Sequence, residues 1–285
     1  MGWAMDATLA RYARRDAVAA ERAGERIGLL AYRIDKKHRL RAEANLRLAF
    51  PEKPAGWAEA TARESFLHFG RLAGDLMRSP SRTDAEVLEN MEVPPGMDGF
   101  FQQEGKRGIM LCTGHLGNWE RAAHWVTARG HKLSVVIRHA NQPAVQERLE
   151  RLRQSSGIEL LSRGDAAMGM LRRLRRGECL ALLPDQNSDE AFVPFFNHST
   201  GTVLGPGVLA KRTNSLVVAA FCLRTGPGQY RYTLQDPLDA KTTDLDPEGI
   251  MAWYYRGLEA AIRQAPEQYL WMHDRWKSAR KRKLL

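Results

Sequence analysis

The sequence predicts an α/β fold with a mostly parallel central sheet flanked by helices and preceded by a helical N-terminal segment. Beyond Gly108, short apolar runs alternate with amphipathic stretches of roughly ten to fifteen residues, a pattern that indicates βαβ units and a parallel sheet. Before that point the apolar residues follow helical spacing. We therefore expect two parts, a helical region over residues 1–100 and an α/β core over residues 101–285 with a basic C-terminal tail.

The N-terminal region carries two informative stretches. Residues 59–77 place Phe66, Phe69, Leu72 and Leu76 at helical spacing, so we expect a helix there. Residues 27–41 combine scattered apolar positions with a dense basic run from residue 33 onward. A basic amphipathic segment of this kind is typical of a helix on anionic lipid, and equally of a helix with one solvated face.

The core elements follow in order along the chain. The expected helices have apolar positions on one face, and suitable caps such as Asn141 before Pro143 and Asp165 before the next helix. Gly130 and Gly177 are suitable stops. The expected strands are 109–113, 133–137, 158–161, 179–183, 216–223 and 230–234, and the expected helices are 118–129, one starting near 143, 165–177, 205–214 and 247–263.

Three cysteines, Cys112, Cys179 and Cys222, each fall inside an apolar run that predicts a buried strand. None of them belongs to a C-x-x-C pair, so we interpret them as reduced thiols packed in the core, as in a cytosolic protein. We also find no run of ~20 apolar residues and no secretory signal. The chain as written is therefore expected to be soluble or peripheral rather than membrane-spanning.

The net charge favours an anionic partner. Lys and Arg number 43 against 33 Asp and Glu, which gives +10. Such an excess attracts a membrane surface, a nucleic acid or an acidic carrier protein.

The stretch that carries chemistry is 113–120, with the sequence TGHLGNWE. It lies where a buried strand ends and a helix begins, and ligands bind in open α/β sheets at this edge. On a continuous helix His115 and Glu120 would lie about 140° apart. With His115 in the loop and Glu120 in the first helical turn, we expect Glu120 to accept a hydrogen bond from one ring nitrogen. The other nitrogen could then take a proton from a hydroxyl group. The alternative is a histidine that only caps the helix.

This stretch resembles the H-x4-D/E motif of the glycerolipid acyltransferase superfamily, and more closely the H-x-G-N-W-E form of the late acyltransferases of bacterial lipid A biosynthesis. Further blocks that resemble this family are 45–52, Ile137-Arg138 with Asn141 and Pro143, Asp185-Gln186, 193–196 with Thr202 and Gly205-Pro206, and 268–273 with Arg275 and Lys277. The resemblance therefore covers nearly the whole chain, from about residue 33 to 277.

The resemblance implies transfer of a fatty acyl group from acyl carrier protein, or from acyl-CoA, to a hydroxyl group of a lipid A precursor. His115 would be the general base and Glu120 its partner. Arg138 is the side chain that the resemblance favours for the oxyanion or an acceptor phosphate, with Asn118 and the backbone of Gly117 nearby. Arg138 could equally be a surface charge.

Asp185 and Gln186 follow a buried strand and are expected on the same rim, although a polar loop that closes the strand end would have the same sequence. We expect no metal and no nucleotide cofactor, since the Walker A and dinucleotide patterns are absent.

The resemblance also implies a place at the cytoplasmic face of the bacterial inner membrane. Relatives usually begin with a hydrophobic anchor, which this chain does not show. We therefore expect either peripheral attachment through the basic ends or an anchor missing from the sequence.

Three rival hypotheses remain. A metal hydrolase could use His115, Glu120 and His124, although H-E-x-x-H requires two histidines four apart. A nucleic-acid-binding protein would also be basic, but no RRM or helix-turn-helix pattern is found, and we expect no nucleic acid. An acyltransferase with another acceptor, such as a lysophospholipid, an ornithine-type lipid or a mannosylated lipid, would use the same chemistry.

Overall fold

The structure is a computed structural model that describes residues 10–136, 143–161 and 166–285. Its centre is an eight-stranded sheet with the strand order β1-β9-β8-β2-β5-β3-β4, to which β10 adds beside β8. The strands of this sheet are β1 Met91–Glu92, β2 Ile109–Cys112, β3 Leu133–Val136, β4 Glu159–Leu161, β5 Cys179–Leu182, β8 Leu216–Gly226, β9 Gln229–Leu234 and β10 Leu238–Asp239.

The pairing of the strands is mostly parallel, as predicted. β8, β2, β5, β3 and β4 run parallel to one another, whereas β9 and β10 pair antiparallel with β8. The six strands expected from the sequence correspond to β2, β3, β4, β5, β8 and β9. The short strands β1 and β10 were not predicted, because two residues are too few to produce an alternation pattern.

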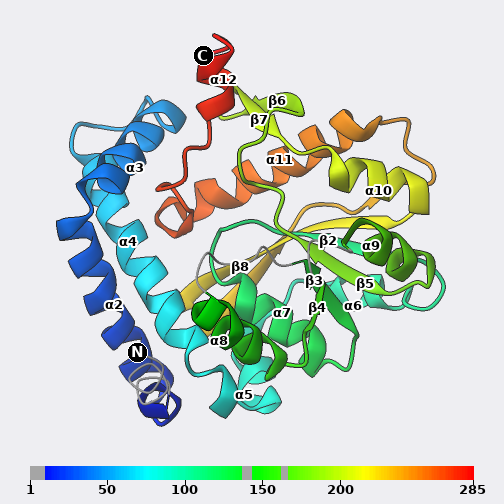
Figure 1. Cartoon of the computed structure of the whole chain (residues 1–285), viewed down its shortest axis with the longest axis horizontal. Coiled ribbons are helices and arrows are strands. Elements are labelled where there is room, and N and C mark those ends of the chain that lie inside the picture. The colour runs from blue at the N-terminus through cyan, green and yellow to red at the C-terminus, as the bar shows by residue number, and fades with distance from the viewer. Residues whose placement is uncertain (1–9, 137–142, 162–165) are drawn as a thin grey trace.

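Helices cover both faces of the sheet (Figure 1). The side chains of β2 alternate between two hydrophobic cores. Met110 and Cys112 belong to the core under α10 (Gly205–Thr213) and α11 (Pro247–Gln264), while Ile109 and Leu111 belong to the core under α7 (Trp119–Ala128). The helices of the α/β part are α5 Asp84–Glu89, α6 Met97–Phe101, α7 Trp119–Ala128, α8 Pro143–Gln154, α9 Ala166–Arg175, α10 Gly205–Thr213 and α11 Pro247–Gln264.

The N-terminal region is helical, as predicted, and packs beside the sheet (Figure 1). It consists of α2 Ala17–Ile34, α3 Lys36–Ala49 and α4 Trp57–Leu76, followed by the 3-10 turn Ser79–Ser81. The backbones of α2 and α4 touch through glycines, since a Cβ atom on Gly24 would lie 2.0 Å from the carbonyl oxygen of Gly70. Helix α4 thereby stands between α2 and the α/β core.

The C-terminal part adds a feature that the sequence patterns did not reveal. β6 Ala191–Phe195 and β7 His198–Thr202 form a separate two-stranded hairpin. Phe196 and Asn197 make its turn with φ of 51° and 60°. The 3-10 turn Pro266–Gln268 and helix α12 Lys277–Lys281 complete the chain.

The sequence also predicts the state of the cysteines and the membrane topology. All three cysteines are unpaired and buried, as predicted. None of the helices within the described ranges combines the length and the apolar character needed to cross a membrane.

Candidate active site

His115 lies in the turn between β2 and α7, at the carboxyl edge of the sheet. Asp185 lies at the same edge, beyond the end of the neighbouring strand β5. The ring atom Nδ1 of His115 is 2.7 Å from Oδ1 of Asp185, and the backbone N–H of His115 donates to Oδ2 over 2.8 Å. One buried carboxylate therefore holds both the ring and the backbone of the histidine.

The register of the sheet explains this contact. Cys112 of β2 is paired with Leu182 of β5 in parallel. His115 and Asp185 each follow their paired residue by three positions, so both reach the same level above the sheet. Local sequence spacing cannot reveal this, because the residues are 70 positions apart.

Glu120 was predicted to accept a hydrogen bond from one ring nitrogen of His115, but in this structure Nδ1 contacts Asp185 and the Glu120 carboxylate contacts Arg153 and Trp119. Glu120 lies in the first turn of α7, as predicted, but its carboxylate accepts hydrogen bonds from Arg153 of α8 at 2.6 and 3.0 Å. It also accepts one from the indole nitrogen of Trp119 at 3.1 Å. The physical reason is that a cation from α8 and the indole of the preceding residue are closer partners, while Asp185 occupies Nδ1.

Electrostatics favour an ion pair between His115 and Asp185. Burial lowers the pKa of His115, but the charge and hydrogen bond of Asp185 together with the charge of Glu120 outweigh it, so the pKa lies above the usual value of histidine. Burial raises the pKa of Asp185, but the charge and hydrogen bonds of His115 lower it by more, so the pKa lies below the usual range. Each group thus stabilises the charged form of the other.

Arg153 was not singled out by the sequence analysis. Burial lowers the pKa of its guanidinium, but the charge and hydrogen bond of Glu120 together with the charge of Glu150 outweigh it, so the net shift is upward. Both charged groups also act on His115: Glu120 raises the pKa of the imidazole, and Arg153 lowers it. No local pattern marks Arg153 among the many arginines of 148–153, because its position on α8 is set by the tertiary fold.

A cavity of about 560 Å³ opens at this group of residues. His115, Glu120, Arg153 and Gln186 line it together with apolar side chains from α7 and the sheet. The α7 residues include Trp119, Ala122, Ala123 and Val126, and the strand residues include Leu111, Leu133, Ala181 and Ala220. The cavity is therefore polar and charged around the imidazole and apolar along most of its remaining wall.

The other predicted site residues differ in whether they line the cavity. Gln186 lines the cavity beside His115. Asn118 is buried behind the turn, where its side chain accepts the N–H of Arg121 and donates to Asp75, and Gly117 makes the turn with φ of 63°. Neither Gly117 nor Asn118 is among the described residues that line the cavity. Arg138 and Asn141 lie outside the described residues.

The histidine of the rival metal-site hypothesis has a different partner. His124 of α7 is buried, and its Nε2 lies 3.1 Å from a carboxylate oxygen of Asp84. Among the described residues, no group of three or more His, Cys, Asp or Glu side chains has the arrangement of a metal site. The geometry around His115 is instead that of an imidazole base oriented by a carboxylate.

Comparison with known proteins shows similarity to acyltransferases of lipid A biosynthesis. The profile of the family described as bacterial lipid A biosynthesis acyltransferase matches residues 3–278. The chain is 26% identical to a lipid A biosynthesis palmitoleoyltransferase of Escherichia coli K12 over 261 residues, which is 90% of this chain and 84% of that protein. It is 27% identical to the lipid A biosynthesis lauroyltransferase of the same organism over 262 residues, 90% of this chain and 85% of that protein.

Two more distant proteins are also similar. A phosphatidylinositol mannoside acyltransferase of Mycobacterium tuberculosis is 23% identical over 209 residues, 70% of this chain and 66% of that protein. Among solved structures, the 1-acyl-sn-glycerophosphate acyltransferase PlsC of Thermotoga maritima aligns with a TM-score of 0.39 and 12% identity, covering 84% of this chain and 97% of that one.

Proposed function

The chain belongs to the bacterial lipid A biosynthesis acyltransferase family and is an acyltransferase of lipid A biosynthesis, and from this premise we propose how it performs the reaction. It moves a fatty acyl group from acyl carrier protein to a hydroxyl group of a lipid A precursor, with His115 as the general base. The observation that carries the proposal is the imidazole of His115, which is held by Asp185 and lines a largely apolar cavity.

The tautomer of His115 is determined by its hydrogen-bond partner, the carboxylate of Asp185. A carboxylate only accepts hydrogen bonds, so neutral His115 carries its proton on Nδ1 and directs it to Asp185. The lone pair of Nε2 then takes the proton of the acceptor hydroxyl as its oxygen attacks the thioester carbonyl. The tetrahedral intermediate collapses with cleavage of the C–S bond, and the departing thiolate takes the proton back from the imidazolium. Asp185 stabilises that imidazolium during the reaction.

Glu120 acts in this proposal at the wall of the cavity rather than on Nδ1. Its carboxylate holds Arg153 and Trp119, and its charge supports the basicity of His115. Arg153 and Gln186 are the described cavity residues that we assign to donate hydrogen bonds to the oxyanion or to a phosphate. Arg138 remains a candidate for the same role by family resemblance. The reaction as written needs no metal or cofactor.

The partners are assigned from charge and chemistry. Acyl carrier protein is acidic and lipid A precursors bear phosphates, so the net charge of +10 favours both over a neutral partner. Acyl-CoA is the alternative donor. We expect no nucleic acid partner. The cavity, with Ala122, Ala123 and Val126 along α7, takes the acyl chain.

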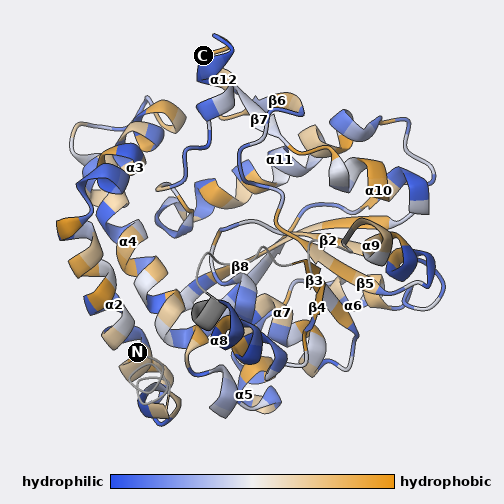
Figure 2. Cartoon of the chain, viewed as in Figure 1, coloured by the Kyte–Doolittle hydropathy of each residue, from blue (hydrophilic) through white to orange (hydrophobic). Residues whose placement is uncertain are grey.

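We also assign the protein to the cytoplasmic face of the inner membrane, held there at least in part by α2. Ile27, Leu30 and Ile34 are exposed on this helix by 53%, 57% and 72%. Basic side chains are exposed around them at Arg22, Arg26, Arg33, Lys36 and Lys37. Figure 2 shows hydrophobic residues at intervals along α2 on the outer side of the N-terminal helices. An apolar stripe flanked by cations suits an anionic lipid surface.

The experiment that tests the function presents acyl carrier proteins loaded with several chain lengths to the purified protein, together with lipid A precursor or lysophospholipid. Products are identified by mass. Acylated lipid A precursor is the expected product, and transfer only to lysophospholipid would overturn the assigned acceptor. A mannosylated lipid belongs in the acceptor panel because of the mycobacterial relative. His115→Ala is expected to lose about 10²–10⁴-fold in rate while remaining folded.

A further inference from the structure

The turn that carries His115 is tied to the molecule from several sides. The carbonyl of His115 accepts the N–H of Leu270 at 3.0 Å, and the N–H of Gly117 donates to the carbonyl of Gln268 at 3.0 Å. The N–H of Asn118 donates to the carbonyl of Cys222 in β8 at 2.7 Å. A Cβ atom on Gly117 would lie 1.9 Å from that same Cys222 oxygen, so β8 closes one side of the turn completely.

Helix α4 also contacts the turn, through His68. This histidine is 2% exposed, and its Nε2 lies 3.0 Å from the carbonyl oxygen of Gly117. A carbonyl only accepts, so Nε2 carries a hydrogen and donates it. Burial, together with the nearby Arg224 and Arg71, lowers the pKa of His68 to about 4. The side chain is therefore neutral at physiological pH and acts as a fixed hydrogen-bond donor.

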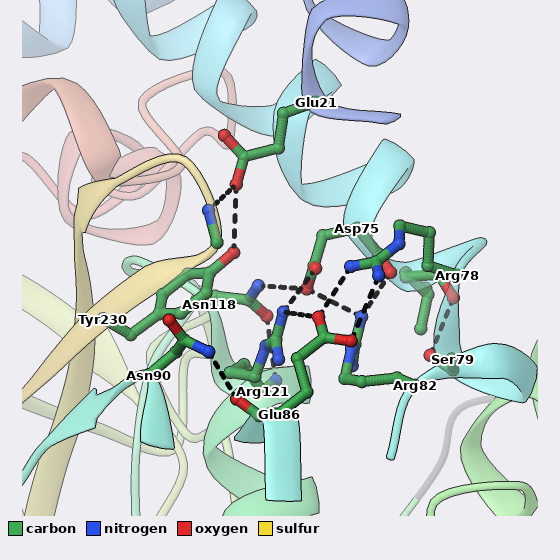
Figure 3. Close-up of polar contacts among 12 residues, drawn as sticks. Glu21, Asp75, Arg78, Ser79, Arg82, Glu86, Asn90, Asn118, Arg121 and Tyr230 are labelled. Atoms are coloured by element: carbon green, nitrogen blue, oxygen red, sulfur yellow. Dashed lines mark hydrogen bonds and ion pairs between the residues drawn. The ribbon is translucent and has the colours of Figure 1, made fainter. Parts of the chain in front are cut away.

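The same helix reaches the end of the turn through Asp75. Figure 3 shows Asp75 at the centre of a buried polar network. Its Oδ2 accepts the side-chain amide of Asn118 at 2.8 Å, and its Oδ1 accepts the guanidinium of Arg121 at 2.7 Å. Arg82 forms a further ion pair with it at 2.9 Å. Burial raises the pKa of Asp75, but Arg82 and Arg121 lower it by more, so the carboxylate is charged.

The two α4 residues lie on one face of their helix. Asp75 follows His68 by seven residues, and seven residues are about two turns at ~3.6 residues per turn. Both side chains therefore point the same way, toward the turn, while the glycines Gly70 and Gly74 between them pack on α2. The face of α4 toward the core is occupied by the active-site turn.

We propose that His68 and Asp75 are positioning residues that fix the turn 115–118 from behind, so that the Nε2 of His115 faces the cavity. This inference rests on the proposed function of His115. His68 holds the backbone at Gly117, and Asp75 holds Asn118, which caps α7. Neither residue is among the described residues that line the cavity.

The test compares His68→Leu with His68→Gln in acyl transfer to the lipid A precursor. Leucine fills a similar volume without a donor, whereas the amide nitrogen of glutamine can donate to the carbonyl of Gly117. A displacement of about 1 Å at a reacting group can cost 10²-fold. We therefore expect kcat to fall by about 10–100-fold in His68→Leu, with KM little changed, and to recover within a few-fold in His68→Gln.

A second readout separates positioning from folding. In His68→Leu the contact of His115 with Asp185 is expected to loosen, so the acid limb of the pH profile of kcat/KM moves to lower pH. The charged and titratable groups that act on His115 are Asp185, Glu120, Arg153 and His273, and none of them is substituted in this variant. A merely structural role would lower the amount of folded protein without moving that midpoint. Circular dichroism reports the folded fraction.

If His68→Leu does not fold, Asn118→Ser tests the same idea at the other contact. Serine still caps α7 but is too short to reach Asp75, so the same fall in kcat is expected. Unchanged kcat and pH profile in the folded variants would overturn the inference, as would an equal loss in His68→Leu and His68→Gln. If His115→Ala keeps full activity, the proposed function itself is wrong, so the two failures are distinguishable.

Discussion

The proposed base, His115, and the carboxylate that orients it, Asp185, are the residues on which the proposed chemistry depends. Asp185 is 2% exposed, and its Oδ1 lies 2.7 Å from Nδ1 of the His115 ring. A buried carboxylate of this kind stabilises the imidazolium as it forms and excludes the wrong tautomer. His115 must be neutral to accept a proton. Because its pKa is raised, the wild-type rate is expected to fall as the pH drops through a midpoint above the usual value of histidine.

Replacing Asp185 with asparagine tests this arrangement. The amide removes the charge that raises the pKa of His115, and its NH2 group can donate to Nδ1 and favour the wrong tautomer. We expect a loss of about 10²–10⁴-fold in kcat and, in the remaining activity, an acid limb at lower pH. Initial rates measured over a pH series check both effects.

Glu120→Gln is the matched comparison for that experiment. Glutamine keeps the size of Glu120 and can still accept from Arg153 and Trp119, while it loses the charge that supports the basicity of His115. We expect a smaller loss than in Asp185→Asn. A larger loss in Glu120→Gln would show that Glu120, rather than Asp185, is the principal partner of the base.

At the scale of elements, the sequence predicted what local patterns determine. The central strands are buried on both sides, so their apolar runs can be recognised in the sequence. The apolar residues of the N-terminal helices can be recognised by their helical spacing. The contact of His115 with Asp185 depends on the register of β2 and β5, and the contact of Glu120 with Arg153 depends on how α8 packs. Both are tertiary, and no window of sequence contains them.

Helix α7 forms one wall of the cavity, which gives a prediction for chain-length preference. Ala123→Phe adds a ring where α7 faces the cavity, so the longest acyl chains should be excluded while shorter ones are still transferred. Competition among acyl carrier proteins of different chain lengths, read by product mass, checks this. Ala128→Phe, at the end of the same helix and away from the lining, is the control. An unchanged product distribution in Ala123→Phe would place the acyl chain elsewhere.

The contact between α2 and α4 gives a prediction about stability. In Gly24→Ala the new methyl carbon would lie 2.0 Å from the carbonyl of Gly70, so the two helix backbones must separate. Such overpacking costs about 1–3 kcal/mol. Gly99→Ala in α6 meets nothing within 4 Å and serves as the control. Urea unfolding should show a lower midpoint for Gly24→Ala only, and equal midpoints would contradict the close packing of these helices.

At the scale of the whole molecule, the N-terminal helices connect the proposed lipid-binding surface with the turn of the α/β core that carries His115. Helix α2 presents its apolar and basic side chains outward, α4 lies against it through glycines, and the inner face of α4 holds the turn that carries His115. The proposed lipid-binding helix is thus separated from the base by a single helix. This arrangement suits an enzyme whose acceptor is embedded in a membrane, because the proposed lipid-binding helix and the turn that carries the proposed base both pack against α4.

The membrane proposal can be tested apart from catalysis. Replacing Ile27, Leu30 and Ile34 of α2 with serine removes the exposed apolar stripe without touching the cavity. We expect the wild-type protein to sediment with vesicles that contain phosphatidylglycerol, less so at high salt, and the triple variant to bind much more weakly. Each cation near an anionic surface contributes only about 1 kcal/mol, so the apolar stripe is needed for firm binding.

Leu284→Ser is the control, because Leu284 is a leucine at the C-terminal end that is 49% exposed. Transfer to a detergent-dispersed acceptor should be unchanged in the triple variant, whereas equal vesicle binding by variant and wild type would remove α2 from the membrane contact.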